Sequence, residues 1–180
     1  LKRGHFGMIA PRIFGLPEKE MYQIFKNILL EDVEDHDLCL SQFIISELDG
    51  EYVGGSCAWI EGEVPSAFIK ANLLSHFLPK ENFLNALPVL DMMKEIQFER
   101  EPGAIQIEGV FLEPKFRMPG QILANVLAHI DHLCKLNLEI TKTQGQISGV
   151  NAGFVRMLRK IDFYQTDYKE ATNDTILKYI

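Results

Sequence analysis

The chain has 180 residues, the usual size of one domain and enough to bury a hydrophobic core. Acidic side chains outnumber basic ones by 25 to 18, giving a net charge of −7, which argues against a nucleic-acid-binding surface because such surfaces carry a basic excess. No apolar run reaches the roughly 18 residues that a membrane span needs, and no signal peptide is visible. We therefore expect a single cytoplasmic domain over residues 1–180 that binds neither nucleic acid nor membrane.

Before residue 43 the chain shows one clear helical pattern. Phe6 to Ile9 is expected to form a short first strand. Apolar side chains then repeat at helical spacing after Pro17, at Met21, Ile24, Phe25, Ile28 and Leu29. The acidic run 31–37 is either a solvated connection into the sheet or an acidic rim that attracts an amine.

A β-hairpin is predicted next. Phe43–Leu48 and Tyr52–Ile60 are two apolar runs joined by Asp49-Gly50. This dipeptide is a strong hairpin signal because both of its residues tolerate a positive φ. Gly54-Gly55 inside the second strand predicts a bulge or a close backbone contact.

From Pro65 to Arg100 the chain turns helical. Apolar residues recur at spacings of three and four over 67–77 and 81–98, and Pro79 separates the two segments. Pro88 is expected to kink or split the second helix. The pair is interpreted as an extra packing layer or as a surface for a homodimer.

Residues 103–136 are predicted to form a buried strand, a tight turn and a long amphipathic helix. The strand ends at Glu113-Pro114 because proline cannot donate to a ladder, and Arg117 to Gly120 make the turn. A turn that leads into a helix start directs several backbone N–H groups at one spot, and the helix dipole adds partial positive charge there. The pattern therefore predicts an anion site suited to a phosphate or pyrophosphate.

The end of the chain is predicted to return to the sheet. Leu138–Thr143 is expected to be a strand, and Asn151 is a good N-cap for the helix that follows. Phe163–Tyr168 and Thr175–Tyr179 are expected to form a terminal strand pair.

The histidines and cysteines give no metal site. His129 and His132 stand three residues apart with no second cluster at matching spacing, so we expect both on a solvated helix face and no bound metal. The cysteines are widely spaced without a Cys-x-x-Cys pair, which is typical of reduced core thiols: Cys39, Cys57 and Cys134.

Three of these segments, in this order, resemble the GNAT (Gcn5-related N-acetyltransferase) family. They are the Asp49-Gly50 hairpin followed by Val53-Gly54-Gly55, the run Leu112-Glu113-Pro114 with Arg117-Met118-Pro119-Gly120-Gln121-Ile122, and Asn151 with Phe163. The resemblance covers about residues 43–163. It implies an α/β (α+β) GNAT fold with a central mixed, mostly antiparallel twisted sheet and flanking helices. Residues 65–100 would then be a helical insertion between the third and fourth strands, for which a wall of the acceptor pocket is a further interpretation beside packing and a homodimer surface.

The resemblance also implies an activity and a co-substrate. The chain would transfer an acetyl group from acetyl-CoA to a primary amine of a small-molecule or amino-acid-like acceptor. The backbone of Phe111 and Leu112 would bond the pantetheine arm of acetyl-CoA, and Asn151 would contact it as well. The pyrophosphate would be held by the backbone around the turn, at Arg117, Met118, Gly120, Gln121 and Ile122.

Direct attack by the amine requires a base for its proton and a proton for the leaving thiolate. Glu108, on the strand before the turn, is the candidate base, or else a polar strand residue or a salt-bridge partner. Leu158 stands where the family has an acidic Tyr and cannot donate a proton, so Tyr164 is the candidate acid. Leu158 and Ile122 both depart from the family pattern, which leaves a second interpretation: a catalytically degenerate GNAT-fold protein that binds CoA or a partner in a regulatory role.

Overall fold

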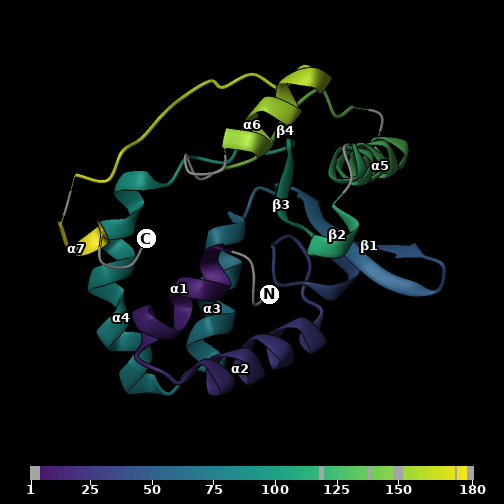
Figure 1. Cartoon of the computed structure of the whole chain (residues 1–180). Coiled ribbons are helices and arrows are strands. Elements are labelled where there is room, and N and C mark those ends of the chain that lie inside the picture. The colour runs from purple at the N-terminus through teal and green to yellow at the C-terminus, as the bar shows by residue number, and fades with distance from the viewer. Residues whose placement is uncertain (1–4, 118–119, 138, 148–151, 173, 178–180) are drawn as a thin grey trace.

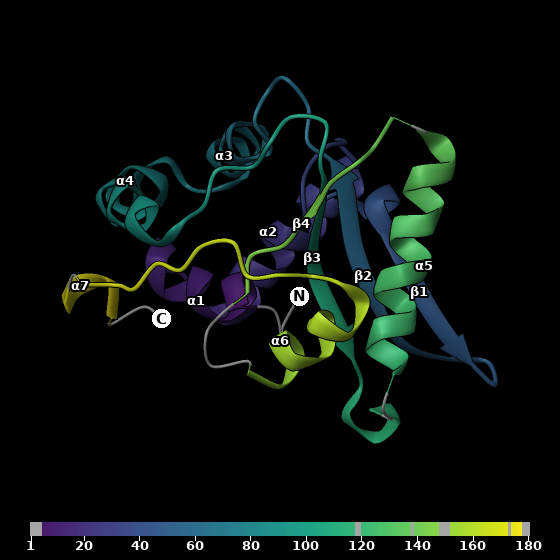
Figure 2. The same ribbon diagram turned by 90° about the horizontal axis from the view of Figure 1, so that it is seen from above.

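The computed structural model describes residues 5–117, 120–137, 139–147, 152–172 and 174–177. A four-stranded sheet separates two helical layers of unequal size (Figures 1 and 2). Helix α5 (Gln121–Leu136) packs on one face of the sheet. The layer on the other face contains α1 (His5–Phe14), α2 (Glu18–Glu31), α3 (Ser66–Phe77) and α4 (Lys80–Met93).

The strands follow one another across the sheet in the order β1-β2-β3-β4. The first two pairs are antiparallel and the last pair is parallel. The predicted mixed, mostly antiparallel sheet with flanking helices is therefore confirmed. Its strands are β1 (Phe43–Leu48), β2 (Glu51–Ile60), β3 (Ile105–Leu112) and β4 (Thr143–Gln144).

The hairpin forms where the sequence predicts it. Asp49 has a φ of 51° and Gly50 a φ of 81°, so both adopt the left-handed backbone that a two-residue hairpin turn requires. Further along β2, a Cβ atom on Gly54 would lie 2.6 Å from the carbonyl oxygen of Phe111. Glycine at position 54 therefore allows β2 and β3 to approach closely, which is the close backbone contact that the sequence predicts.

A bulge interrupts β3 in its middle. Gly109 and Val110 stand opposite Ser56 alone, between regular pairs on either side. Gly109 has a φ of 59°, a conformation that glycine adopts without strain. The bulge separates Glu108 from Phe111 and changes the direction of the strand between them.

The face of the sheet under α5 is apolar. Ala58 of β2 and Ile107 of β3 pack with Val126 and Leu133 of α5 in one buried cluster. Because successive side chains along a strand point to opposite faces, Glu108 lies on the face toward the larger helical layer.

The larger helical layer has a core of its own. Phe14 of α1, Phe25 of α2, Leu74 of α3 and Ala86 of α4 belong to one buried cluster. The insertion therefore packs on the N-terminal helices, α3 against α2 and α4 against α1. Helix α4 continues through Pro88, so the insertion is not split there.

Short elements complete the fold. They are η1 (Leu40–Gln42), η2 (Lys94–Ile96), η3 (Pro114–Phe116), α6 (Ala152–Leu158), η4 (Arg159–Ile161) and α7 (Asp174–Leu177).

Cys39 and Cys57 are buried free thiols, as expected, and Cys134 is half-buried. Within the described residues, no helix is both long and apolar enough to cross a membrane.

The predicted first strand at Phe6–Ile9 is wrong, because these residues lie in helix α1. The reason is visible in the burial: Ile9, Ala10, Ile13 and Phe14 are buried at helical spacing in the core of the helical layer. Consequently the sheet begins at β1, and the helical insertion connects the second and third strands of the observed sheet.

The predicted terminal strand pair is wrong as well. Residues 163–172 have no regular secondary structure and residues 174–177 are helical. Thr172 donates from its backbone N–H and its hydroxyl to Glu95 Oε1, at 2.9 and 2.6 Å, which ties this segment to η2. Ile176 is buried and α7 packs on α4, so the apolar residues here are covered by helix packing. The predicted strand at 138–143 is observed only as β4, and Leu138 lies outside the described residues.

Candidate functional site

Strands β3 and β4 are paired only at their beginning. Ile105 pairs with Thr143 and Gln106 with Gln144, and among the described residues β3 has no strand partner on that side beyond this point. An unpaired strand edge presents backbone N–H and C=O groups that are free to bond another molecule. Phe111 and Leu112, the residues predicted to bond a pantetheine arm, lie at the far end of this edge.

The turn after β3 leads into α5 through Gly120. This residue has a φ of 91°, and a Cβ atom built on it would have no neighbour within 4 Å. The first turn of α5 contains no acidic side chain, so nothing there opposes the positive end of the helix dipole. Gln121 and Ile122 begin the helix and are half-buried. Met118 and Pro119 lie outside the described residues.

The side chain of Arg117 makes a structural hydrogen bond. Its Nε donates a hydrogen bond to the carbonyl oxygen of Leu112 at 3.0 Å, which ties the turn back to the end of β3. The guanidinium therefore has a structural contact of its own, while the sequence predicts a backbone role for this residue. That backbone role stays a prediction.

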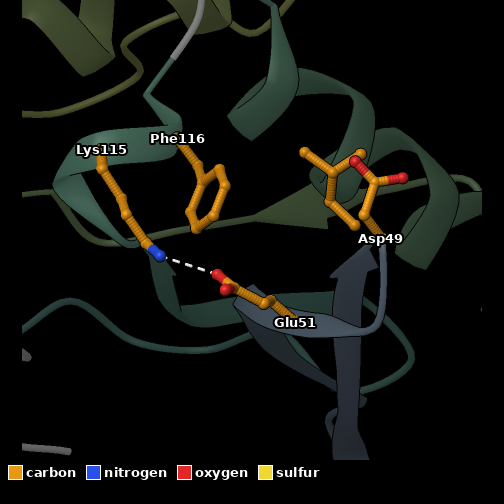
Figure 3. A pocket seen from close by; sticks show the side chains of 5 residues that line it. Asp49, Glu51, Lys115 and Phe116 are labelled. Atoms are coloured by element: carbon orange, nitrogen blue, oxygen red, sulfur yellow. Dashed lines mark hydrogen bonds and ion pairs between the residues drawn. The ribbon is translucent and has the colours of Figure 1, made fainter.

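A pocket opens between the hairpin and the turn after β3 (Figure 3). Lys115 reaches across to Glu51, and its Nζ lies 2.7 Å from Oε2 of that residue. Both side chains are more than 60% exposed, so this ion pair contributes little to stability. The pocket is lined by Leu48, Asp49, Glu51, Lys115 and Phe116.

A second, more apolar hollow lies on the face that carries Glu108. Ile45 and Phe111 flank Gly55, because a Cβ atom there would lie 3.2 Å from each of their side chains. Gly55 and Cys57 share a face of β2, and Cys57 pairs with Glu108. The hollow is lined by Ile45, Tyr52, Gly54 and Phe111.

Glu108 forms an ion pair with Arg100. Nη2 of Arg100 contacts Oε1 of Glu108, and the two side chains are 22% and 23% exposed. Nη1 of Arg100 donates to the Ser66 hydroxyl at 3.1 Å, and the guanidinium lies 5.4 Å from the centroid of the Trp59 ring. The salt-bridge role that the sequence left open for Glu108 is therefore present. Its role as a base stays a prediction.

A second ion pair lies beside the first. Lys70 of α3 contacts Asp37, with Nζ and Oδ1 2.8 Å apart, and the side chains are 18% and 14% exposed. Burial raises the pKa of Glu108, as does the negative charge of Asp37, while Lys70 and Arg100 act in the opposite direction. Burial also acts to raise the pKa of Asp37, but Lys70, Arg100 and His36 together outweigh it and hold that pKa below its usual value.

On the opposite face, under α5, a neutral polar pair is buried. The Ser56 hydroxyl lies 2.8 Å from Nδ1 of His129 and 3.4 Å from Oδ1 of Asn125. Burial lowers the pKa of His129 to about 4, and His132 adds to this effect. The prediction of a solvated face is wrong for His129, which is 2% exposed and belongs with Asn125 and Leu133 to the sheet-facing side of α5. Among the described residues, no group of three His, Cys, Asp or Glu side chains is placed to hold a metal.

Tyr164 is not on a strand, and within the described residues no hydrogen bond joins it to Glu108. Its side chain is 74% exposed, and its hydroxyl donates to Oδ1 of Asp162 at 3.1 Å, a contact that raises the pKa of Tyr164. Asp162 adopts a left-handed backbone with a φ of 60°. Leu158 is buried in α6, and Asn151, predicted to cap this helix, lies outside the described residues.

Comparison with solved structures decides which fold this is. The crystal structure of an N-acetyltransferase from Staphylococcus aureus Mu50 superposes on 85% of this chain and 86% of its own, with a TM-score of 0.50 and 12% identity. This chain has the N-acetyltransferase fold. A predicted acetyltransferase with acetyl-CoA from Clostridium acetobutylicum covers 93% of the chain and 87% of its own, with a TM-score of 0.44 and 14% identity. No family model and no curated protein sequence matches the chain.

On the N-acetyltransferase fold, the predicted site residues fall into two groups. Phe111, Leu112 and the start of α5 lie along one route, from the open edge of β3 to the helix N-terminus. Glu108 lies across the bulge on the face toward the helical layer. Sequence reasoning missed the charged partners of Glu108. One signal was available, since Lys70 is the only lysine or arginine in helix α3.

Proposed function

We propose that the chain is an acetyl-CoA-dependent N-acetyltransferase that acetylates a primary amine of a small-molecule or amino-acid-like acceptor by direct attack. The observation that carries the proposal is the position of a half-buried carboxylate, Glu108, immediately before the bulge of β3 on an acetyltransferase fold. A base for the amine and an open strand edge for the co-substrate are thus supplied by the same strand.

Acetyl-CoA would supply the activated acetyl group, and the residues along β3 and α5 fit it. The backbone of Phe111 and Leu112 would bond the pantetheine arm. The pyrophosphate would be held at the turn, from Arg117 to the start of α5, where the open space around Gly120 and the absence of an acidic side chain in the first turn support close approach of an anion. Met118 and Asn151 complete the predicted set.

Glu108 would take the proton of the amine. Among the described residues, hydrogen bonds reach only Oε1 of its carboxylate, so Oε2 remains to accept a proton. A raised pKa brings a carboxylate closer to the pH at which it works best as a base. The apolar hollow beside Phe111 would cover the carbon skeleton of the acceptor. The leaving thiolate would take its proton from water or from Tyr164.

One observation favours a second candidate function, that of a degenerate acetyltransferase fold that binds CoA or a partner in a regulatory role. Leu158, at the family's acid position, is buried and has no proton to give. The two candidates differ in one measurable respect, because the regulatory protein would bind acetyl-CoA or CoA without turning it over.

Thermal unfolding with acetyl-CoA tests co-substrate binding. A ligand that binds only the native state stabilises it by about 2.7 kcal/mol at a concentration one hundred times its Kd, so the Tm should rise with acetyl-CoA concentration. Adenosine is the matched control, since it lacks the pyrophosphate and the pantetheine arm and should give no comparable shift. An unchanged Tm at millimolar acetyl-CoA would contradict the enzyme and also a regulatory protein that binds CoA, leaving only one that binds a partner.

Turnover then separates the two candidates. Acetyl-CoA is incubated with a panel of primary amines, and free CoA is detected together with the mass of the acetylated product. Amine-dependent release of CoA supports the enzyme. A Tm shift with no release for any amine in the panel supports the regulatory protein.

A further inference from the structure

Four charged side chains from four separate segments meet between the sheet and the helical layer. Asp37 comes from the loop after α2, Lys70 from α3, Arg100 from the segment before β3, and Glu108 from β3. Each side chain is between 14% and 23% exposed, and positive and negative charges are equal in number. Two of the four, Lys70 and Arg100, belong to the helical insertion.

Arg100 is fixed on three sides. Its Nη1 bonds the hydroxyl of Ser66, its Nη2 bonds Glu108, and its plane lies over Trp59. Ser66 and Trp59 are fixed in turn by Glu61, whose carboxylate accepts the backbone N–H of Ser66 at 2.8 Å and the indole N–H of Trp59 at 2.9 Å. A planar guanidinium held in this way can direct only one orientation of a carboxylate.

Such an arrangement is not needed to fill space. Ion pairs with little solvent contact are costly to desolvate, and apolar side chains of similar volume are often at least as stabilising. The helical layer already has an apolar core that includes Leu74 of α3 and Ala86 of α4. The cluster therefore calls for an explanation other than packing, and its one member beside the bulge of β3 is Glu108.

We propose that the helical insertion supplies two positioning residues, Arg100 and Lys70, which hold the Glu108 carboxylate in one orientation and in its ionised form. The inference rests on the proposed function of Glu108 as a base. It gives the insertion a task beyond packing: Arg100 contacts Glu108 directly, and Lys70 neutralises Asp37, whose charge would otherwise oppose ionisation of Glu108.

The charged and titratable groups that act on Glu108 come from each neighbouring segment. Arg100 and Lys70 favour the ionised carboxylate, whereas Asp37 and burial oppose it. On β2, the thiol of Cys57 pairs with Glu108 in the strand register, and burial raises the pKa of this thiol, so it stays neutral. Removing the positive charge at position 100 should therefore raise the pKa of Glu108 and leave a larger fraction protonated at neutral pH.

The test titrates Glu108 directly and does not depend on activity. Side-chain carboxyl NMR signals of protein labelled at glutamate are followed against pH in the wild type, with Glu108→Gln to assign the signal. We expect the Glu108 midpoint to move to higher pH in Arg100→Met and to remain near the wild-type value in Arg100→Lys, which keeps the charge. Lys94→Met is the matched control, since Lys94 belongs to an exposed ion pair at the end of α4, and it should leave the midpoint unchanged.

Activity provides the second readout. If Glu108 is the base, the acidic limb of the rate profile should shift to higher pH in Arg100→Met, while Arg100→Lys should lower kcat without that shift because the guanidinium fork is lost. Should Arg100→Met not fold, as judged by circular dichroism, Lys70→Met replaces it, and it is also expected to raise the midpoint.

The two proposals can fail separately. An unchanged Glu108 midpoint in Arg100→Met, or in Lys70→Met if that variant is used, overturns the positioning role whatever the activity. Full activity of Glu108→Gln overturns the role of Glu108 as the base, and with it the catalytic meaning of the positioning.

Discussion

The two faces of the sheet bury polar groups in opposite ways. Under α5, Ser56 and His129 form a neutral pair among apolar side chains. On the other face, Glu108 and Arg100 form an ion pair that keeps about a fifth of each side chain exposed. A neutral pair needs only its own hydrogen bond to be buried, whereas a charged pair needs compensating charge around it. The α5 face therefore buries a neutral polar pair within apolar packing, whereas the opposite face holds the charge cluster at which we propose the chemistry.

Replacing Glu108 should have the largest effect on activity. A positioned base contributes about 10²- to 10⁴-fold to a rate, so Glu108→Gln should lower kcat by at least the smaller factor. The measurement is the rate of CoA release with the best amine acceptor. Asp91→Asn is the control, because Asp91 is an exposed carboxylate on α4 and should have no effect. An equal loss of rate in both variants would contradict a specific role for Glu108.

Acid should destabilise the α5 face through His129. The pKa of this residue is about 4 in the folded protein, below its usual 6.5, so the unfolded chain binds more protons between these values. Stability is therefore lost as the pH falls from 6.5 toward 4, by about 3 kcal/mol for this group, since one pKa unit corresponds to about 1.4 kcal/mol.

Urea unfolding at several pH values between 7 and 4 measures this loss. The wild type includes contributions from its carboxylates, so the informative quantity is its difference from His129→Gln, in which the contribution of His129 is absent. His76→Gln serves as the control because His76 is exposed on helix α3, away from His129. Identical pH dependence in the wild type and His129→Gln would show that the buried pair under α5 does not hold His129 neutral.

The junction of β2 and β3 should tolerate no side chain at Gly54. A Cβ atom there would lie 2.6 Å from the carbonyl oxygen of Phe111 and 3.1 Å from the Cα of Leu112, both backbone atoms that cannot move aside. We expect Gly54→Ala to lower the free energy of unfolding by about 1–3 kcal/mol. Gly153→Ala in α6 is the control, since a Cβ atom there meets nothing and alanine favours a helix. Equal stability of the two variants would contradict the close approach of the strands.

The sequence predicted correctly those elements whose formation depends on residues close together in the chain. Asp49-Gly50 specified the hairpin because its turn depends on two adjacent residues, and helical spacing identified α5. Phe6–Ile9 was misassigned because a short apolar run suits a strand or a helix equally, and packing against α2 and α4 decides between them. His129 was misassigned because its burial depends on Ser56, far away in the sequence.

Sequence patterns likewise revealed only those residues of the candidate site that lie close together in the chain. Glu108, Gly120 and their neighbours belong to one continuous strand–turn–helix, so a sequence pattern reveals them together. The charge cluster around Glu108 joins separate segments, among them those of Asp37 and Lys70, which are 33 residues apart, and only the topology brings them together. A lone lysine in a helix that packs against other elements indicates that a partner is needed, but the sequence of the helix does not say which.

The pH dependence of CoA release in the wild type and in Glu108→Gln, with the same amine acceptor, tests the central claim most directly. The account predicts amine-dependent release in the wild type, with an acidic limb set by the ionisation of Glu108. In Glu108→Gln it predicts a rate at least about 10²-fold lower that has lost this limb. Equal rates and the same acidic limb in both proteins would contradict it.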